Sequence, residues 1–193
     1  MRKQLWVLVG GNGAGKSTFY HRFLEPKGMK FVNADVLAKQ FYPEAPEAHS
    51  YEAAEQAGIL RERMLAEGRN FAFETVFSHP SKIDFIAKAK SYGYEIIMVV
   101  LHVNDVSLNK ARISQRVEEG GHFVPDEKVE TRIPRTLANI KAAIPLCDRV
   151  HILDNSSFDS PFRQVLTISN QNVDYACSPL PDWAQNLIRI SSV

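Results

Sequence analysis

Residues 10–18 have the types and the spacing that hold a phosphate. The segment Gly10-Gly11-Asn12-Gly13-Ala14-Gly15-Lys16-Ser17 satisfies the pattern G-x-x-x-x-G-K-[ST] in full, and Thr18 follows it. Glycines let the backbone wrap a phosphate, amides at a helix amino terminus attract negative charge, and the lysine bridges the outer phosphates of a nucleotide. We therefore predict ATP binding along residues 10–18, a catalytic role for Lys16 and coordination of Mg²⁺ by Ser17. ATP is favoured over GTP because the chain has no guanine-reading Asn-Lys-x-Asp motif.

A second group, Asn33-Ala34-Asp35, follows a short apolar run that reads as a strand. In open α/β sheets, ligands bind where parallel strands end, so these residues are predicted to lie beside the phosphate loop. A carboxylate in that place can accept the proton of an incoming hydroxyl, which makes Asp35 a candidate base and Asn33 a candidate substrate contact. The alternative is that Asp35 caps the following helix, and both roles can coexist.

A third group, Phe73-Glu74-Thr75-Val76, closes the next apolar run. Glu74 and Thr75 are predicted to contact substrate, and Glu74 can also support Mg²⁺ through water. The alternative for Glu74 is a partly exposed carboxylate at a strand end. No apolar run here ends in the Asp-Glu pair typical of motor ATPases, which weighs against that class.

Arginines gather on both sides of a glycine pair in the second half of the chain. They are Arg112, Arg116, Arg132 and Arg135, around Gly120-Gly121-His122 and Pro134. Two basic helices joined by a glycine hinge predict a mobile lid that neutralises charge during phosphoryl transfer. Arg112 is then predicted to contact the nucleotide, Arg116 to be catalytic, and Arg132 and Arg135 to contact substrate. The alternative is surface pairing with nearby acidic residues.

Asn155 lies in Asp154-Asn155-Ser156, directly after the last buried run. P-loop kinases commonly place a loop against adenine at this point, so Asn155 is a candidate nucleotide contact. An ordinary polar turn is the alternative interpretation.

Short apolar runs alternate with longer amphipathic stretches, which predicts the α/β class with a parallel five-stranded sheet flanked by helices. The expected strands are 4–9, 30–33, 70–74, 95–103 and 149–154. The expected helices are 15–24, 47–66, 81–92, 106–119 and 125–144, the last kinked or divided at Pro134. Residues 163–168 and 173–176 predict a β-hairpin appendage, and a short helix is expected from Asp182 to Ile190, with Trp183 and Leu187 packed on the body.

Length and charge limit the number of domains and the kinds of partner. With 193 residues, 45% of them hydrophobic, the chain fits one domain with a small appendage. We predict a P-loop core at 1–157 with a helical lid around 105–144, and a hairpin with a short helix at 158–193. A net charge of +1 gives no reason to expect nucleic acid or a membrane as partner. The apolar run at 5–9 is too short for a signal peptide, which predicts a cytoplasmic protein.

Taken in order, these motifs resemble the zeta-toxin family of P-loop kinases from about Leu5 to Ser157. The resemblance implies phosphorylation of a sugar hydroxyl of UDP-N-acetylglucosamine, with Asp35 as base, Glu74 as substrate contact and Arg116 as lid arginine. It also implies an antitoxin protein as a partner. Where the toxins carry a second lid arginine before a proline, this chain has His122 ahead of Pro125, so that role passes to Arg132 or Arg135. A rival hypothesis from a different class is a nucleotide-dependent ATPase or switch that acts on a protein partner.

Overall fold

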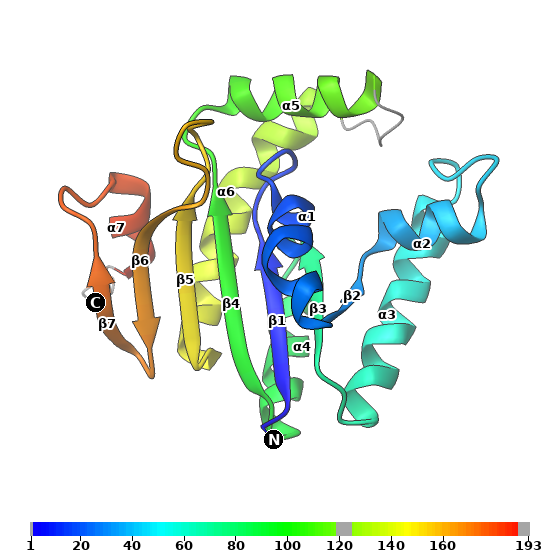
Figure 1. Cartoon of the computed structure of the whole chain (residues 1–193), viewed down its shortest axis with the longest axis horizontal. Coiled ribbons are helices and arrows are strands. Elements are labelled where there is room, and N and C mark those ends of the chain that lie inside the picture. Colours follow the sequence, from blue (N-terminus) through cyan, green and yellow to red (C-terminus); the bar gives the residue numbers. More distant parts are fainter. Residues whose placement is uncertain (1, 119–124, 189–193) are drawn as a thin grey trace.

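The computed structural model describes residues 2–118 and 125–188, except for the side chains at 116, 126 and 128–130. One seven-stranded sheet, ordered β2-β3-β1-β4-β5-β6-β7, runs through the molecule (Figure 1). Its strands are β1 (Gln4–Val9), β2 (Lys30–Val32), β3 (Phe71–Thr75), β4 (Glu95–His102), β5 (Arg149–Asp154), β6 (Arg163–Ser169) and β7 (Asn172–Ala176). The first five are mutually parallel, whereas β6 and β7 are antiparallel additions beyond β5. The predicted α/β fold with five parallel strands is confirmed.

Apolar side chains cover both faces of the central strands. Along β1, Val7 and Val9 belong to one hydrophobic cluster and Leu8, between them, belongs to the other. Successive side chains of a strand point to opposite faces, so an apolar run of this kind is stable only when both faces are covered. Helices therefore have to pack on both sides of the sheet.

The helices form two unequal layers (Figure 1). Their bounds are α1 (Lys16–Phe19), α2 (Ala34–Phe41), α3 (Ser50–Ala66), α4 (Ser81–Ser91), α5 (Val106–Glu118), α6 (Asp126–Ala143) and α7 (Asp182–Ile188). Buried residues of α3, α4, α6 and α7 fill one cluster, and Phe19 of α1 fills the other. A π-helical turn (Tyr20–Leu24) and two 3-10 turns (Glu25–Lys27 and Ile144–Leu146) extend α1 and α6. The α5 helix lies across the edge where the parallel strands end.

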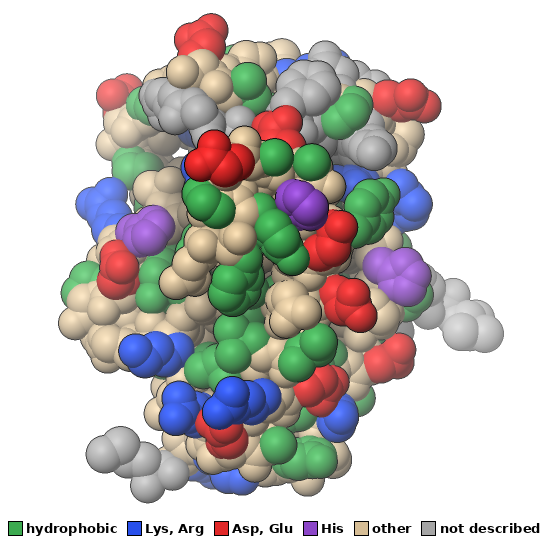
Figure 2. Space-filling model, turned by 90° about the vertical axis from the view of Figure 1, so that its right-hand side faces the viewer, with side chains coloured by type: hydrophobic (Ala, Val, Ile, Leu, Met, Phe, Trp, Pro, Cys, Tyr) green, Lys and Arg blue, Asp and Glu red, His purple; other side chains and the backbone are tan. Residues whose placement is uncertain are grey.

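The α2–α3 side forms an outer wall beyond β2. Seen from that side, hydrophobic side chains lie among charged ones, and cationic side chains gather toward the lower end (Figure 2). Lys30, Arg63 and Arg69 line a hollow there, and Glu67 pairs with both arginines. The α2 helix begins at the carboxyl edge of the sheet, and this charged surface lies at the opposite end of the wall.

Three details differ from the sequence-based expectations. The hairpin is not a separate appendage, because β6 pairs along β5 and buries Val165 and Leu166 in the main core. The division at Pro134 is wrong, since α6 continues through this exposed proline. Contacts on both sides of Pro134 join the helix to the body: Arg132 reaches Asn12, and Thr136 donates to the Val76 carbonyl. No bounds were predicted for α2, which begins directly after Asn33.

The carboxyl-terminal helix packs as expected in its described part. Leu187 is buried in the larger cluster, and the Trp183 ring lies 4.1 Å from the His102 ring, centroid to centroid. The end of this helix, predicted at Ile190, lies outside the described residues. None of the helices within 2–118 and 125–188 is long and apolar enough to cross a bilayer.

Candidate functional site

The phosphate loop leaves the sheet at its topological switch point. From β1 the chain passes outward to β2, returns to β3 beside β1, and then crosses to β4 on the other side of β1. Ligands of open α/β sheets bind outside the carboxyl ends of the strands at such a point. Residues 10–15 occupy this place between β1 and α1.

Two glycines in the loop adopt conformations that side chains rarely take. Gly13 has φ +75° and Gly15 has φ +94°. A Cβ atom added at Gly13 would lie 2.6 Å from the Asn109 carbonyl oxygen, and one at Gly15 would lie 2.5 Å from Asn155 Nδ2. Glycine is therefore required at both positions, by the backbone conformation and by close neighbours together.

Lys16 begins α1 and lies over its own loop. Its Nζ donates to the carbonyl oxygens of Gly10 at 3.0 Å and Gly11 at 2.9 Å, and the residue is only 8% exposed. These bonds hold the ammonium group at the mouth of the loop, where a phosphate oxygen can replace a carbonyl as its partner. The predicted phosphate contact is consistent with this position.

Ser17 and Glu74 meet directly. The Ser17 hydroxyl donates to Glu74 Oε2 at 2.7 Å. Glu74 is the last residue but one of β3 and lies next to Leu8 of β1, so its carboxylate reaches the first turn of α1. In P-loop enzymes a hydroxyl from the loop and an acid at a neighbouring strand end hold Mg²⁺, and oxygen donors of these kinds suit that ion. Glu74 fits the metal-supporting role that the sequence left open beside substrate contact.

Mg²⁺ usually keeps several waters and takes few protein ligands. Across the described part of the chain there is no group of three or more His, Cys, Asp or Glu side chains that could enclose a metal ion. A magnesium ion bound through Ser17, with Glu74 beside it and phosphate oxygens of a nucleotide, needs no such enclosure.

A cavity of about 490 Å³ opens beside the loop. Its size falls in the range of small-molecule sites. The predicted residues that line it are Gly13, Gly15, Lys16, Ser17, Thr18, Glu74, Arg112 and Asn155. Sequence reasoning missed the others, which are Arg22, Gln115, Ser157, Phe158, Pro161 and Phe162. The glutamate and the P-loop thus share one cavity with the middle of α5 and the loop after β5.

Arg112 and Phe158 form a lip on this cavity. The guanidinium carbon lies 5.2 Å from the centre of the Phe158 ring, which is 77% exposed. Arg112 Nη1 is buried and has no hydrogen-bond partner among the residues that the structure describes. Burial lowers the pKa of the Arg112 guanidinium. A flat exposed ring beside such a cation suits an aromatic base with an anionic tail.

Asn155 supports the phosphate loop. Its Nδ2 donates to the Ala14 carbonyl oxygen at 2.9 Å, and its Oδ1 accepts from the Phe162 amide at 3.2 Å. The buried side chain thereby ties residues 155–162 to the loop. The contact to adenine stays a prediction, and the structure adds a positioning role for this residue.

Asn33, and not Asp35, caps α2. Asn33 Oδ1 accepts from the amides of Asp35 at 2.7 Å and Val36 at 3.2 Å, and the residue is 5% exposed. Asp35 lies in the first turn with an exposed side chain, and its carboxylate has no hydrogen-bond partner within 2–118 and 125–188. The alternative of Asp35 as the helix cap is wrong, because the neighbouring asparagine already satisfies these amides.

Of the remaining predicted residues, one contacts the P-loop and two bond within their own segments. Thr75 Oγ1 accepts from the Phe77 amide at 2.9 Å, which fixes the turn after β3. Arg132 Nη1 approaches Asn12 Oδ1 at 3.5 Å, so this arginine reaches the P-loop. Arg135 is exposed and donates back to its own helix at the Thr131 carbonyl.

The centre of the predicted lid lies outside the described residues. This applies to Gly120, Gly121, His122 and the side chain of Arg116. A contact that sequence reasoning missed ties the preceding helix down: buried Asn109 of α5 donates from Nδ2 to the Asn12 carbonyl oxygen at 2.7 Å. An asparagine in an amphipathic helix provides no sequence signal for such a bond.

Comparison with known proteins defines the family. Residues 5–136 match the family model described as AAA domain. An uncharacterized protein of Haemophilus influenzae is 31% identical over 139 residues, which cover 68% of this chain and 99% of that protein.

Solved structures share the fold at low identity. A chain of the AvrRxo1-ORF1:AvrRxo1-ORF2 complex superimposes with a TM-score of 0.75 and 14% identity, covering 97% of this chain and 64% of that one. The same complex with ATP gives 0.73 and 16%, covering 100% and 66%. A chain of the PezAT toxin-antitoxin system of Streptococcus pneumoniae gives 0.68 and 16%, covering 96% and 78%. This chain therefore spans just under two thirds of the matched AvrRxo1 chains.

The family model extends from β1 to the middle of α6, and the Haemophilus influenzae protein matches over nearly its whole length. Together with the P-loop at the switch point of the sheet, these matches show that the chain belongs to the AAA domain family and has a P-loop kinase-like fold.

Proposed function

We propose that this protein transfers the terminal phosphoryl group of ATP to a hydroxyl group of a small molecule. The observation that carries this proposal is the position of Asp35. Its carboxylate is exposed at the start of α2, it has no partner in the described ranges, and Asn33 already performs the capping. A carboxylate at the ligand edge of the sheet, free of a structural task, suits a general base.

Each step of the transfer has a candidate residue. Lys16 and the amides of residues 13–17 hold the phosphates, and Ser17 with Glu74 would hold Mg²⁺, which neutralises phosphate charge when bound. Asp35 accepts the hydroxyl proton while the oxygen attacks the terminal phosphorus and the bond to the ADP oxygen breaks. Arg116 and Arg132 are proposed to neutralise the equatorial oxygens at that moment.

The proposed lid is anchored at both ends. Asn109 ties the beginning of α5 to the P-loop, and Thr136 and Asn139 tie α6 to the carbonyls of Val76 and Phe77. Closure around residues 105–144 would therefore take place between Asn109 and Thr136. Arg112 and Arg132 both lie between these anchors.

The acceptor is proposed more narrowly by resemblance. UDP-N-acetylglucosamine is the first candidate because the motifs resemble those of zeta toxins. A protein partner of antitoxin type belongs to the same proposal, since the PezAT chain that shares this fold comes from a toxin-antitoxin system. A cytoplasmic location would suit both.

One observation favours the alternative function, a nucleotide-dependent ATPase or switch. The Ser17–Glu74 pair alone can support hydrolysis, because transfer to water needs no acceptor pocket. A coupled assay separates the two functions. A kinase turns over ATP faster with its acceptor, so the screen should start with UDP-N-acetylglucosamine and continue with nucleosides and simple sugars. Slow turnover that no small molecule changes would favour the switch.

Asp35→Asn tests the carboxylate itself. We expect phosphoryl transfer to fall by about 10²–10⁴ while ATP affinity and melting temperature stay unchanged, because the amide cannot accept the proton. The matched control is Asp84→Asn, which removes another exposed carboxylate, from the first turn of α4. Transfer within a few-fold of wild type, at saturating ATP and acceptor, would remove Asp35 from the chemistry.

A further inference from the structure

Two cationic side chains lie between α3 and α4 against aromatic rings. The Arg61 guanidinium carbon is 5.2 Å from the ring centre of Phe73 and 5.7 Å from that of Phe85. Lys82 lies in the first turn of α4, three residues before Phe85, and the Arg61 charge lowers the pKa of its ammonium group. Both side chains are half-buried, and the two rings beneath Arg61 belong to the hydrophobic core.

Within the described residues, neither of these cations is paired with a carboxylate. Arg61 Nε is buried without a hydrogen-bond partner there, and no carboxylate in the described chain forms an ion pair with Arg61 or Lys82. Burial lowers the pKa of both groups; Glu62 opposes this only in part at Arg61, and the Arg61 charge lowers the pKa of Lys82 further. Two like charges in a half-buried place with no ion pair among the described residues are costly, and an anionic ligand would offset that cost.

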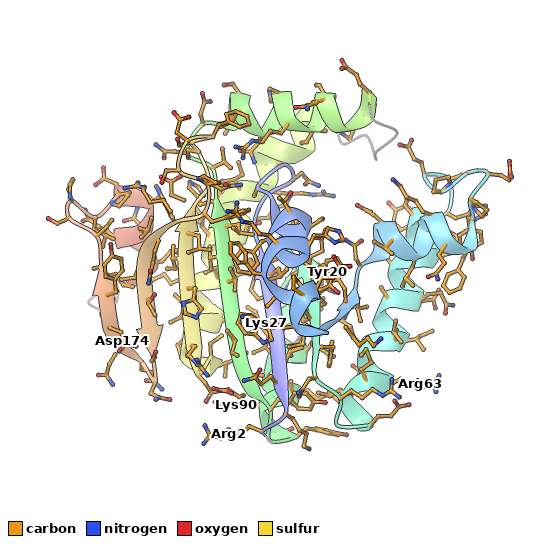
Figure 3. All side chains as sticks on the ribbon, in the orientation of Figure 1. Arg2, Tyr20, Lys27, Arg63, Lys90 and Asp174 are labelled. Atoms are coloured by element: carbon orange, nitrogen blue, oxygen red, sulfur yellow. The ribbon has the colours of Figure 1, made fainter. Side chains whose placement is uncertain are left out.

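Neighbouring cations on the same two helices form ion pairs. Arg63 pairs with Glu67 at 2.7 Å, and Lys88 pairs with Glu62 at 2.7 Å. Arg63 extends away from the sheet on the outer side of α3 (Figure 3). Among the described residues, the lack of an ion pair is therefore a property of Arg61 and Lys82 and not of these two helices in general.

The inward pair, Arg61 and Lys82, is directed toward the edge where the P-loop lies. The α3 helix runs from the carboxyl edge of the sheet toward the opposite end, and Arg61 lies in its second half, over Phe73 in the middle of β3. Side chains of a helix lean toward its amino terminus, and Arg61 Nη2 lies 3.7 Å from the position of a Cβ atom on Gly58, one turn earlier. Lys82 stands near the same edge because α4 begins shortly after β3 ends.

We propose that Arg61 and Lys82 bind an anionic group of the acceptor, a phosphate or a carboxylate. This inference rests on the proposed function and makes it more specific, since a neutral sugar would leave both cations unpaired. The phosphates of ATP are held on the other face of β3: Glu74 points to Ser17, whereas the preceding residue, Phe73, lies under Arg61. The acceptor would thus lie between Asp35 on α2 and the inward pair.

Pyrophosphate binding tests the site independently of catalysis. The protein is first saturated with a non-hydrolysable ATP analogue and Mg²⁺, so that the P-loop is occupied, and pyrophosphate is then titrated by calorimetry at fixed free Mg²⁺. We expect the double variant Arg61→Met, Lys82→Met to lose affinity at least about tenfold. The matched control, Arg63→Met with Lys88→Met, removes the same two charges from the same helices and should bind pyrophosphate as wild type does.

Thermal unfolding without ligand distinguishes binding from packing. Methionine fills the space over the rings without a buried charge, so Arg61→Met should melt at or above the wild-type temperature. Arg61→Lys should keep part of the pyrophosphate affinity, because it keeps the charge. A lower melting temperature for Arg61→Met, together with unchanged pyrophosphate affinity, would make Arg61 a structural residue and overturn the proposal.

Acceptor pairs separate failure of this site from failure of the proposed function. Glucose and glucose 1-phosphate, and uridine and UMP, differ by one phosphate each. We expect a lower KM for the phosphorylated member in wild type, and the double variant should close that gap. Pyrophosphate binding without turnover of any acceptor would refute the kinase while the anion site stands. Turnover with equal KM for both members, and no pyrophosphate binding, would refute the anion site alone. The anion site for an acceptor would also be overturned if an acidic protein bound at Arg61 and Lys82 while pyrophosphate did not.

Discussion

The polar side chains on the two faces of β3 differ in whether the protein itself provides their partners. On the α1 face, Lys16, Ser17 and Asn155 are hydrogen-bonded to the protein, so their positions are fixed before any ligand arrives. On the α3–α4 face, Arg61 and Lys82 form no ion pair in the described chain. A single step along the strand, from Phe73 to Glu74, changes the face. The nucleotide site is thus held in place by hydrogen bonds within the protein, whereas the proposed anion site would be completed by its ligand.

The strongest test of the nucleotide site is Lys16→Ala. We expect turnover to fall by about 10²–10³, as for other donors that stabilise transition-state charge, and ATP affinity to fall by about 10–100-fold. The melting temperature should stay near that of wild type, because Lys16 contacts loop carbonyls and not the hydrophobic core.

Lys27→Ala is the control for the loss of a charge near α1. Lys27 is exposed in the 3-10 turn that extends this helix. Calorimetric titration with ATP should give the wild-type affinity for Lys27→Ala. Equal ATP affinity for Lys16→Ala and wild type would refute the phosphate contact of Lys16.

A smaller effect is expected at Arg132, in the proposed lid. Arg132→Ala should lower turnover by about 10–100-fold, because Arg132 reaches Asn12 of the P-loop. Arg135→Ala should stay within about twofold of wild type, since the one hydrogen bond of Arg135 within the described residues goes to its own helix. Steady-state kinetics at saturating ATP would rank the two. The reverse ranking would mean that α6 rotates on closure and brings Arg135 inward.

Local motifs explain how much of this could be predicted. The P-loop residues are contiguous, so sequence alone identified them, and near-continuous apolar runs identified the five parallel strands. Asn33 and Asp35 were placed at the correct edge, yet sequence could not distinguish the cap from the free carboxylate. Both residue types are good caps, and only the structure shows which oxygen reaches the amides.

Contacts between distant segments explain what sequence could not predict. Arg61 and Arg63 are two residues apart in one helix, and nothing in their neighbourhood shows which one faces the sheet. Asn109 and Phe158 belong to the site only because α5 and the loop after β5 converge on the P-loop. The hairpin was recognised, but its pairing with β5 depends on an open strand edge that exists only in the assembled sheet.

The stability of the fold should depend on pH through His102, which lies on β4 beside the nucleotide site. Burial lowers the pKa of His102, at the end of β4, to about 4, and neighbouring Asp154 on β5 opposes this only in part. Unfolded histidine titrates near 6.5, so between these values the unfolded chain binds more protons. The stability contributed by neutral His102 is full above pH 6.5 and declines as pH falls. We expect a loss of about 1–2 kcal/mol at pH 5.

Urea unfolding at pH 7 and pH 5 measures this loss, with His102→Gln as the reference. Glutamine does not titrate, so the variant should lose less stability between the two pH values. Carboxylates with lowered pKa values, such as Glu95 and Asp148, contribute equally to both proteins and cancel. Identical pH dependence in the two proteins would contradict the buried neutral histidine.

The smallest expected effect is at Asn33, where a substitution should change stability, whereas one at Asp35 should change the rate of transfer. Asn33→Ala removes the oxygen that accepts from the Asp35 and Val36 amides, so the free energy of unfolding should fall by about 1 kcal/mol. Asn33→Asp should restore it, because aspartate caps about as well as asparagine. Asp35→Ala should leave unfolding within about 0.5 kcal/mol of wild type, as for an exposed surface change, while abolishing transfer. If Asp35→Ala instead costs as much stability as Asn33→Ala, the carboxylate has a structural task. Asp35 would then resemble Lys16, Ser17 and Asn155, whose side chains are held by the protein, more than Arg61 and Lys82.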